Sequence, residues 1–158
     1  MSVVNIKKEL LAPCGLYCGV CAIYIAHRDN NLRFKERLVK VYQPFSKTVE
    51  DVKCGGCLSE NQEDIFGYCQ SCPIRDCIKS KGIDGCYQCD DFPCKFIENF
   101  PIPVGKKVML RAIPRWKEIG TEKWVAEEEK RYHCPECDNP LFRGTKRCNN
   151  CGISVDVD

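Results

Sequence analysis

Apolar residues recur at helical spacing in the first third of the chain. Residues 22–42 are a predicted helical stretch, which the polar run Asp-Asn-Asn at 29–31 interrupts. Short polar side chains accept hydrogen bonds from the first turn of a helix, so this run suits the start of a second segment. The apolar stripe of that second segment consists of Leu32, Leu38, Val39, Val41 and Tyr42. Pro44 is expected to end it, because proline cannot continue a helix.

The middle of the chain predicts shorter helices that follow cysteine turns. Residues 48–51 suit a single helical turn, and residues 73–81 and 93–100 suit two short helices. Both of these helices begin with a proline, which fits the first turn because the N–H that proline lacks would have no partner there. Gly82 suits the end of the first of the two.

A more apolar helical region follows between residues 104 and 131. Residues 104–113 are predicted to be helical, Pro114 is expected to open a further turn, and Thr121 is expected to cap a helix over 122–131. Four large apolar side chains are spaced to lie near one face, namely Ile113, Trp116, Ile119 and Trp124. The two tryptophans are therefore interpreted as core residues rather than as a platform for a ligand.

Composition shows why such a chain needs more than its apolar residues to fold. It has 158 residues, of which 15 are cysteines. Without the cysteines the apolar fraction falls from 44% to about 34%, which is low for a soluble domain. Bound zinc can supply the missing stability, on the order of 10 kcal/mol per structural site.

Two features of the sequence indicate a cytoplasmic protein. The first eleven residues, MSVVNIKKELL, lack the apolar stretch and the cleavage site of a secretory signal. The chain also lacks an apolar run long enough to cross a bilayer, so no membrane association is predicted. Thiols stay reduced in the cytoplasm, and paired cysteines there indicate metal or redox chemistry rather than disulfides.

Eleven cysteines lie between residues 14 and 94, and eight of them form four Cys-x-x-Cys pairs. These eight are the first-choice metal ligands: Cys18, Cys21, Cys54, Cys57, Cys69, Cys72, Cys86 and Cys89. Cys14, Cys77 and Cys94 are the second choice, the last two because the spacing Cys-x2-Cys-x4-Cys occurs twice, at 69–77 and 86–94. Tetrahedral zinc needs four donors, and eleven thiols do not divide by four. His27 is the one histidine of this region and is interpreted as a surface residue.

The C-terminal part carries the most specific metal signal. Two Cys-x-x-Cys pairs separated by ten residues have the spacing of a zinc ribbon: Cys134/Cys137 and Cys148/Cys151. Alternating apolar residues at 153, 155 and 157 suit an edge strand beside them. The sequence therefore predicts a mainly α, small and irregular metal-stabilised domain plus a small β zinc ribbon. The predicted boundaries are residues 1–131 for the first domain, with a cysteine core at 11–100 and a helical extension at 101–131, and residues 132–158 for the ribbon.

About three zinc sites are expected, one of them in the ribbon, and an iron–sulfur cluster in the N-terminal region is the alternative. Cys14, Cys18 and Cys21 have the spacing that holds the cluster in radical S-adenosylmethionine enzymes, but Val20 replaces the usual aromatic residue and the alternating strands and helices of that barrel are absent. No catalytic residue is predicted, because no acid/base set or phosphate-binding loop accompanies the cysteines.

Charge argues against nucleic acid as the favoured partner. Each zinc held by four thiolates carries a net charge of about −2, so three sites would change the formal charge from +2 to about −4. Basic residues near the ribbon are Lys130, Arg131, Arg143, Lys146 and Arg147. They are interpreted as balancing anionic metal sites, since exposed aromatic residues do not accompany them.

Four cysteine-containing segments together resemble a known family. They are 12–21 (APCGLYCGVC), 54–57 (CGGC), 69–77 (CQSCPIRDC) and 86–94 (CYQCDDFPC). In these segments the chain resembles a cysteine-rich family of prokaryotic proteins that is classified as a domain of unknown function, over roughly residues 11–100. The resemblance implies metal binding, with an appended ribbon as in some members, but no activity. The sequence thus predicts a zinc-binding module with a protein partner; an iron–sulfur redox protein and a nucleic-acid-binding protein are the alternatives.

Overall fold

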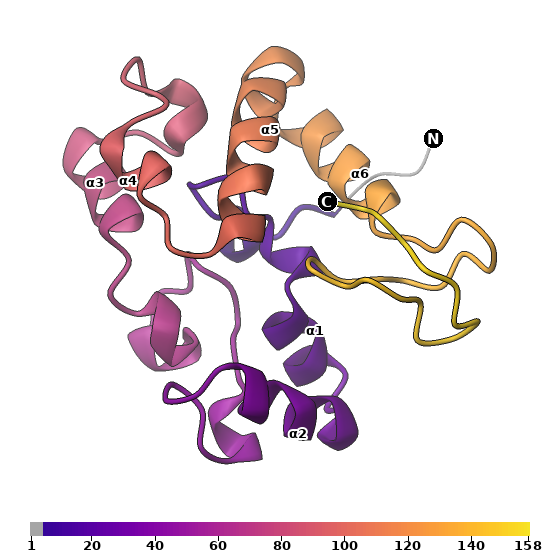
Figure 1. Ribbon diagram of the computed structural model, residues 1–158. Helices are drawn as coiled ribbons and strands as arrows, with labels where there is room; N and C mark the ends of the chain where they lie inside the picture. The colour runs from indigo at the N-terminus through magenta and orange to yellow at the C-terminus, as the bar shows by residue number, and fades with distance from the viewer. Residues whose placement is uncertain (1–4) are drawn as a thin grey trace.

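The computed structural model describes residues 5–158 of the chain, which are mainly helical (Figure 1). Six α-helices lie within these residues: α1 (Ala22–Arg28), α2 (Leu32–Val41), α3 (Pro73–Lys81), α4 (Lys95–Glu98), α5 (Pro103–Ile119) and α6 (Thr121–Arg131). Short 3-10 turns connect them, at Lys8–Leu10, Cys18–Val20, Val49–Asp51, Gln62–Asp64, Gly67–Cys69 and Cys86–Gln88. None of the helices described has the length and apolar character needed to cross a membrane.

Helices α1 and α2 form where the sequence predicts them, with one error about the buried face. The Asn31 side chain caps α2, because its Oδ1 accepts a hydrogen bond from the Phe34 N–H at 3.0 Å. Two members of the predicted apolar stripe are not on the buried face, since Leu32 is 58% and Val41 is 70% exposed. Leu38 is buried, and it lies one turn after the aliphatic stem of Lys35 on the inner face.

The two repeated cysteine units differ in length after their turns. Helix α3 has the predicted bounds, and Gly82 ends it in the left-handed conformation with φ of 67°. Helix α4 is shorter than the predicted 93–100: it begins at Lys95 after Cys94, and Pro93 lies outside it. The two helices lie next to each other, as the repeat predicts (Figure 1).

Helix α5 is continuous through Pro114, so the expected break there is wrong. Proline removes the hydrogen bond to the carbonyl four residues earlier, which here belongs to Leu110. Both Pro114 and Leu110 are exposed, so water can reach that carbonyl. Buried side chains on the opposite face, including Ala112, Ile113 and Trp116, hold the helix against the core.

Thr121 does not cap helix α6, contrary to expectation. Gly120 is the N-cap residue, with φ of 83°, and no side chain caps the helix. Thr121 begins the helix, and its Oγ1 accepts a hydrogen bond from the Trp116 Nε1–H at 2.9 Å. The hydroxyl therefore joins α5 to α6 and satisfies the indole donor of a buried residue.

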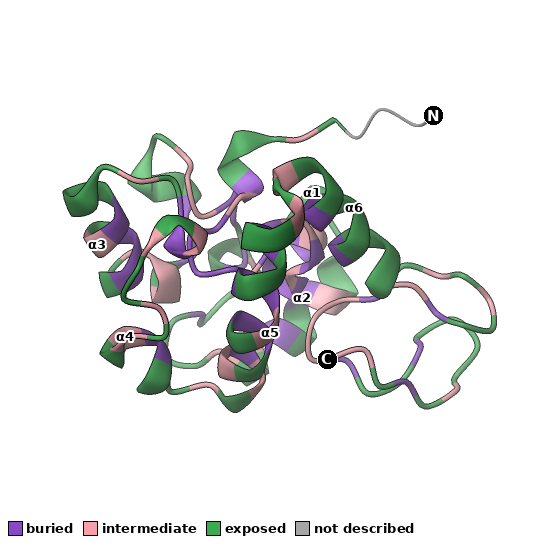
Figure 2. Cartoon of the chain, turned by 90° about the horizontal axis from the view of Figure 1, so that it is seen from above, coloured by how far each residue is buried: buried purple, intermediate pink, exposed green. Residues whose placement is uncertain are grey.

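A column of aromatic rings crosses the core between α5 and α6. Trp116 and Trp124 stack with ring centroids 3.9 Å apart and an angle of 5° between the rings. Tyr87 also stacks on Trp116, with ring centroids 4.3 Å apart. Tyr17 packs edge-on against Trp124, with ring centroids 6.0 Å apart. The prediction that both tryptophans are core residues is confirmed, since they are 2% and 0% exposed. Buried positions line the inner sides of these helices (Figure 2).

Residues 132–158 form an irregular C-terminal module without a strand. Its antiparallel pairing consists of two isolated bridges, from His133 to Pro140 and from Arg147 to Ser154. Val155 is buried, but the expected edge strand around it does not form. This module packs through buried side chains on the same core as α5 and α6.

Candidate metal centre

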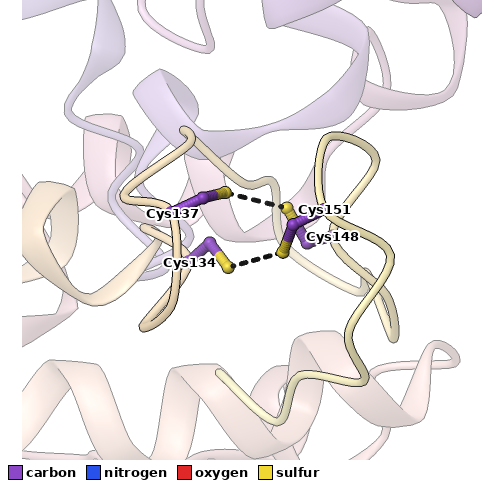
Figure 3. Close-up of side chains that lie close together, drawn as sticks. All are labelled: Cys134, Cys137, Cys148 and Cys151. Carbon is purple, nitrogen blue, oxygen red and sulfur yellow. Dashed lines mark hydrogen bonds between the residues drawn. The ribbon is translucent and has the colours of Figure 1, made fainter.

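The four cysteines of the C-terminal module come together at one point (Figure 3). The sulfurs of Cys134, Cys137, Cys148 and Cys151 all lie within 4.8 Å of one another. The Cys134–Cys151 sulfur pair is 3.6 Å apart, and the Cys137–Cys148 pair is 3.7 Å apart. Four sulfurs at the usual zinc–sulfur bond length around a tetrahedral ion are separated by about 3.8 Å. The cluster therefore has the spacing to hold a metal ion.

Local backbone turns place these sulfurs. The Asp138 N–H donates to the Cys134 carbonyl, and Asp138 has a positive φ of 59°. In the second turn the Gly152 N–H donates to the Cys148 carbonyl at 3.0 Å, and Gly152 has φ of 80°. Each Cys-x-x-Cys segment thus closes through the same hydrogen bond and presents two sulfurs on one side.

Hydrogen-bond donors from the second turn point at the sulfurs. The backbone N–H of Asn150 donates to the sulfur of Cys148 at 3.4 Å. The side-chain amide of Asn150 donates to the sulfur of Cys137, also at 3.4 Å. The Asn150 amide is the main reason that the pKa of Cys137 is lowered. The backbone N–H of Cys151, followed by that of Asn150, lowers the pKa of Cys148. These donors stabilise thiolates, which is the form that binds a metal.

The fourth thiol shows how strongly the sulfurs of this cluster affect one another. The pKa of Cys151 is lowered by the Ile153 N–H, but burial and the neighbouring thiols Cys134, Cys137 and Cys148 raise it more, so it stands above the ordinary value. Four thiolates at these separations repel one another strongly unless a cation lies between them. The four soft sulfur donors fit zinc, and also fit iron in a thiolate site.

The eleven cysteines of the N-terminal region are less closely grouped. Within residues 5–158, no group of three or more Cys, His, Asp or Glu side chains other than the C-terminal four has all its ligand atoms within 4.8 Å. All eleven carry free thiols. They are the first-choice pairs Cys18/Cys21, Cys54/Cys57, Cys69/Cys72 and Cys86/Cys89 and the second-choice Cys14, Cys77 and Cys94. Their assignment as ligands stays a prediction.

In the second repeat, one cysteine is affected by the thiols of both repeats. Burial, followed by the thiols of Cys94, Cys89 and Cys77 in that order, raises the pKa of Cys86 to about 12. Lys81 lies beside this group, because its Nζ is 3.2 Å from the sulfur of Cys89 and 3.0 Å from an oxygen of Asp91.

The N-terminal part of the chain matches one family model. The model describes a protein of unknown function, DUF3795, and it matches residues 10–99. The chain belongs to the DUF3795 family. The resemblance that the cysteine spacing predicts over residues 11–100 is therefore confirmed, whereas the zinc ribbon stays a prediction. A comparison with curated proteins and one with solved structures give no match.

The bounds of the DUF3795 match separate two groups of cysteines. All eleven N-terminal cysteines lie inside residues 10–99, and the C-terminal cluster lies outside them. Helices α5 and α6 also lie outside, yet they contact the family region through the aromatic column, which ends at Tyr17 and Tyr87. Each of these tyrosines stands between two cysteines of a predicted metal-binding turn.

Gly56, in the Cys54–Cys57 turn of the DUF3795 region, has no room for a side chain. Its φ is 115°, and a Cβ there would clash with the carbonyl group of Glu9. Glu9 is held in place because its carbonyl accepts the Leu58 N–H at 3.1 Å. This turn therefore requires glycine for its backbone conformation and for the close approach of another segment.

We expect Gly56→Ala to lower the free energy of unfolding by about 2 kcal/mol or more, because it adds a backbone clash to an unfavourable φ. Gly82→Ala is the matched control: its φ is 67°, but nothing lies within 4 Å of the added Cβ. The control should lose about 1 kcal/mol, from the left-handed conformation alone. Urea denaturation of both variants, purified under identical conditions, measures the difference, and equal losses would contradict the clash.

The two histidines have no contact with either group of thiols. His27 is exposed at the end of α1, as the surface interpretation predicts. Partial burial, followed by Lys35 and Lys53, lowers its pKa. His133 Nδ1 lies 2.7 Å from the carbonyl oxygen of Glu129, so it contacts the end of α6 rather than a sulfur.

Two residues near the sulfurs, Asn150 and Arg75, are not predicted from the sequence as part of a site. Asn150 supplies the donors described above, and Arg75 Nη1 lies 4.0 Å from the sulfur of Cys57. One arginine in a short helix next to lysines resembles an ordinary surface residue, so the sequence carries no signal for Arg75. Arg143 is among the basic residues interpreted from the sequence as balancing anionic sites, and it donates to the carbonyls before Cys18 and Cys21.

Proposed function

We propose that the protein is a zinc-binding module in which the C-terminal four-cysteine cluster holds a structural zinc ion and forms a small zinc ribbon. The observation that carries the proposal is the convergence of four sulfurs within 4.8 Å, with two pairs at 3.6 and 3.7 Å. Four protein ligands complete a tetrahedral site and leave no position for water or substrate. Such a closed site supports folding rather than catalysis.

The irregular structure of the C-terminal module supports a structural role for this metal. Residues 132–158 contain two isolated bridges and no strand, so no continuous ladder of backbone hydrogen bonds holds the segment. A segment of this size rarely folds without a metal or a disulfide. We propose that zinc supplies this stability and that the protein acts in the cytoplasm as a binding or adaptor module for another protein.

The test compares Cys148→Ser/Cys151→Ser with the wild type. The double variant should contain one zinc equivalent per chain less than the wild type, measured by elemental analysis of anaerobically purified protein. Asn149→Ser, in the same turn but not a ligand, is the matched control and should keep its full zinc content. A double variant with the same metal content as the wild type would overturn the proposal. A double variant that loses iron and acid-labile sulfide instead of zinc would identify an iron–sulfur protein.

Cobalt distinguishes a closed site from an open one. Cobalt-loaded protein should show thiolate-to-cobalt charge-transfer bands that weaken in the double variant. Added imidazole should leave the wild-type spectrum unchanged, because four sulfurs already occupy the tetrahedral positions. A spectral change on adding imidazole would instead indicate an open position and a catalytic role.

A further inference from the structure

Three cysteine turns of the DUF3795 region are joined by contacts beside α3. Their cysteines, together with Cys14, are called the N-terminal thiol cluster, defined as Cys14, Cys18, Cys21, Cys54, Cys57, Cys69 and Cys72. A direct contact joins two of its turns, because the Cys57 N–H donates to the sulfur of Cys18 at 3.4 Å. A second contact joins the 54–57 turn to the 69–72 turn, because the Arg75 guanidinium donates to the carbonyls of both Cys57 and Cys69.

Arg75 is buried against this cluster. It is 5% exposed, and its guanidinium donates to three backbone carbonyls: those of Cys57, Cys69 and Gln70. Its Nη1 also lies 4.0 Å from the sulfur of Cys57. The arginine therefore joins two cysteine turns and directs its positive charge at the thiols.

Arg143 reaches the same cluster from the C-terminal module. Its backbone N–H donates to the Val20 carbonyl at 2.9 Å, and its Nη1 donates to the Tyr17 carbonyl at 3.1 Å. These carbonyls belong to the residues just before Cys21 and Cys18. Burial lowers the pKa of Arg143, but the thiols of Cys21, Cys18 and Cys14, together with Tyr132, raise it above its ordinary value.

Neither guanidinium has a carboxylate partner. Among residues 5–158, no Asp or Glu oxygen lies within 4.0 Å of Arg75 or Arg143. A buried cation without a nearby anion is strongly unfavourable, and neutral thiols do not supply the missing negative charge. The two arginines thus indicate that the cluster around them carries negative charge in the functional protein.

Backbone donors give an independent sign of thiolate character. The Gly56 N–H lies 3.4 Å from the sulfur of Cys54, two residues earlier. The C-terminal cluster has the same contact, from the Asn150 N–H to the sulfur of Cys148, also at 3.4 Å. Hydrogen bonds of this kind to cysteine sulfur are typical of metal-bound thiolates.

We propose that the N-terminal thiol cluster holds a second metal centre of net negative charge, for which Arg75 and Arg143 are the charge-compensating residues. Four thiolates around a divalent ion carry a net charge of about −2, which two guanidinium groups balance. An oxidised iron–sulfur cubane bound by four thiolates carries the same charge. Both candidate centres are therefore dianions held by four thiolates. The centre is separate from the C-terminal site, and Arg143 links the two.

The experiment follows metal release from the wild-type full chain to a chromogenic chelator. We expect more than one metal equivalent per chain and two kinetic phases. Cys148→Ser/Cys151→Ser should remove one phase, and Cys57→Ser/Cys72→Ser should remove the other. Elemental and sulfide analysis of the latter variant shows whether zinc or an iron–sulfur cluster has been lost, and the visible spectrum distinguishes the two in the wild type.

Arginine variants then test charge compensation. Arg75→Gln and Arg143→Gln should speed the N-terminal phase on the order of tenfold, because loss of an outer-sphere partner weakens metal binding by about that factor or more. Arg75→Lys should restore part of the wild-type release rate, because it keeps the positive charge. Arg115 is an exposed arginine on α5, away from the cluster, so Arg115→Gln should change neither phase.

Three outcomes would overturn the proposal. A single metal equivalent that disappears in Cys148→Ser/Cys151→Ser would show that the N-terminal cluster holds none. Release rates in the Gln variants within twofold of the wild type would show that the arginines do not compensate charge. Equal acceleration of both phases would identify the arginines as general stability residues. Loss of the N-terminal metal alone, with the C-terminal equivalent intact, supports the proposal and leaves the zinc-module proposal standing.

Discussion

Trp124→Ala will lower the free energy of unfolding by about 3–5 kcal/mol, the usual cost of removing a large buried aromatic side chain. Trp124 is fully buried and makes two ring contacts, one stacked on Trp116 at 3.9 Å and one against the edge of Tyr17 at 6.0 Å. Its loss opens a cavity beside the first cysteine turn. Urea denaturation measures the change, and near-ultraviolet circular dichroism should show loss of the stacked pair.

Trp124→Phe is the matched control for this prediction. The indole Nε1 of Trp124 is buried and has no hydrogen-bond partner among the described residues. Phenylalanine keeps a ring in the column and removes this unsatisfied donor, so the loss should be only about 1–2 kcal/mol. A phenylalanine variant as unstable as the alanine variant would show that ring stacking is not the main contribution.

Arg111→Met should also cost about 3–5 kcal/mol, because it leaves a buried carboxylate without a partner. Arg111 Nη1 lies 2.6 Å from Glu128 Oε1, and the Glu128 side chain is 3% exposed. Burial lowers the pKa of Arg111, but the hydrogen bond and charge of Glu128 raise it more. The pair thus joins α5 to α6 through a charge-assisted contact that is largely removed from water.

The pH dependence of this loss follows from the unpaired carboxylate. In Arg111→Met the buried Glu128 carboxyl group has lost its cationic partner, and burial favours its neutral form. The folded variant then binds more protons, so its deficit relative to the wild type shrinks as the pH falls. Arg111→Met/Glu128→Leu should recover most of the stability, since an apolar pair removes the buried charge.

Arg115→Met is the control for the ion pair on the same helix. Arg115 contacts Glu118 and Glu127 at the surface, where solvent screens the charges. This variant should unfold at nearly the same urea concentration as the wild type. A loss as large as that of Arg111→Met would show that burial of Glu128 does not determine the effect.

The sequence predicts those elements whose signals are local. Helix α3 is bounded by Pro73 and Gly82, and both residues act through their own backbone preferences. The C-terminal cluster is also local, because two Cys-x-x-Cys turns ten residues apart need only a short loop to meet. Asn31 caps α2 for the same reason.

The features that sequence patterns miss depend on distant residues. Pro114 remains inside α5 because buried neighbours hold the helix and water reaches the freed carbonyl. The exposure of Leu32 and Val41 depends on what other segments leave uncovered, which periodicity cannot show. Arg75 and Arg143 acquire their positions from contacts with separate cysteine turns, and they lie 68 positions apart in the chain.

The contact of Arg143 with Tyr17 and Val20 has a consequence for the order of assembly in the cell. Residues 10–99 leave the ribosome before Arg143, so the family region is made before one of the two arginines that lie against its cysteine turns. Under the proposed charge balance, an early metal at the N-terminal thiol cluster would be held loosely and could exchange. Completion of the C-terminal module would then fix this metal, so that metal retention would mark the finished chain.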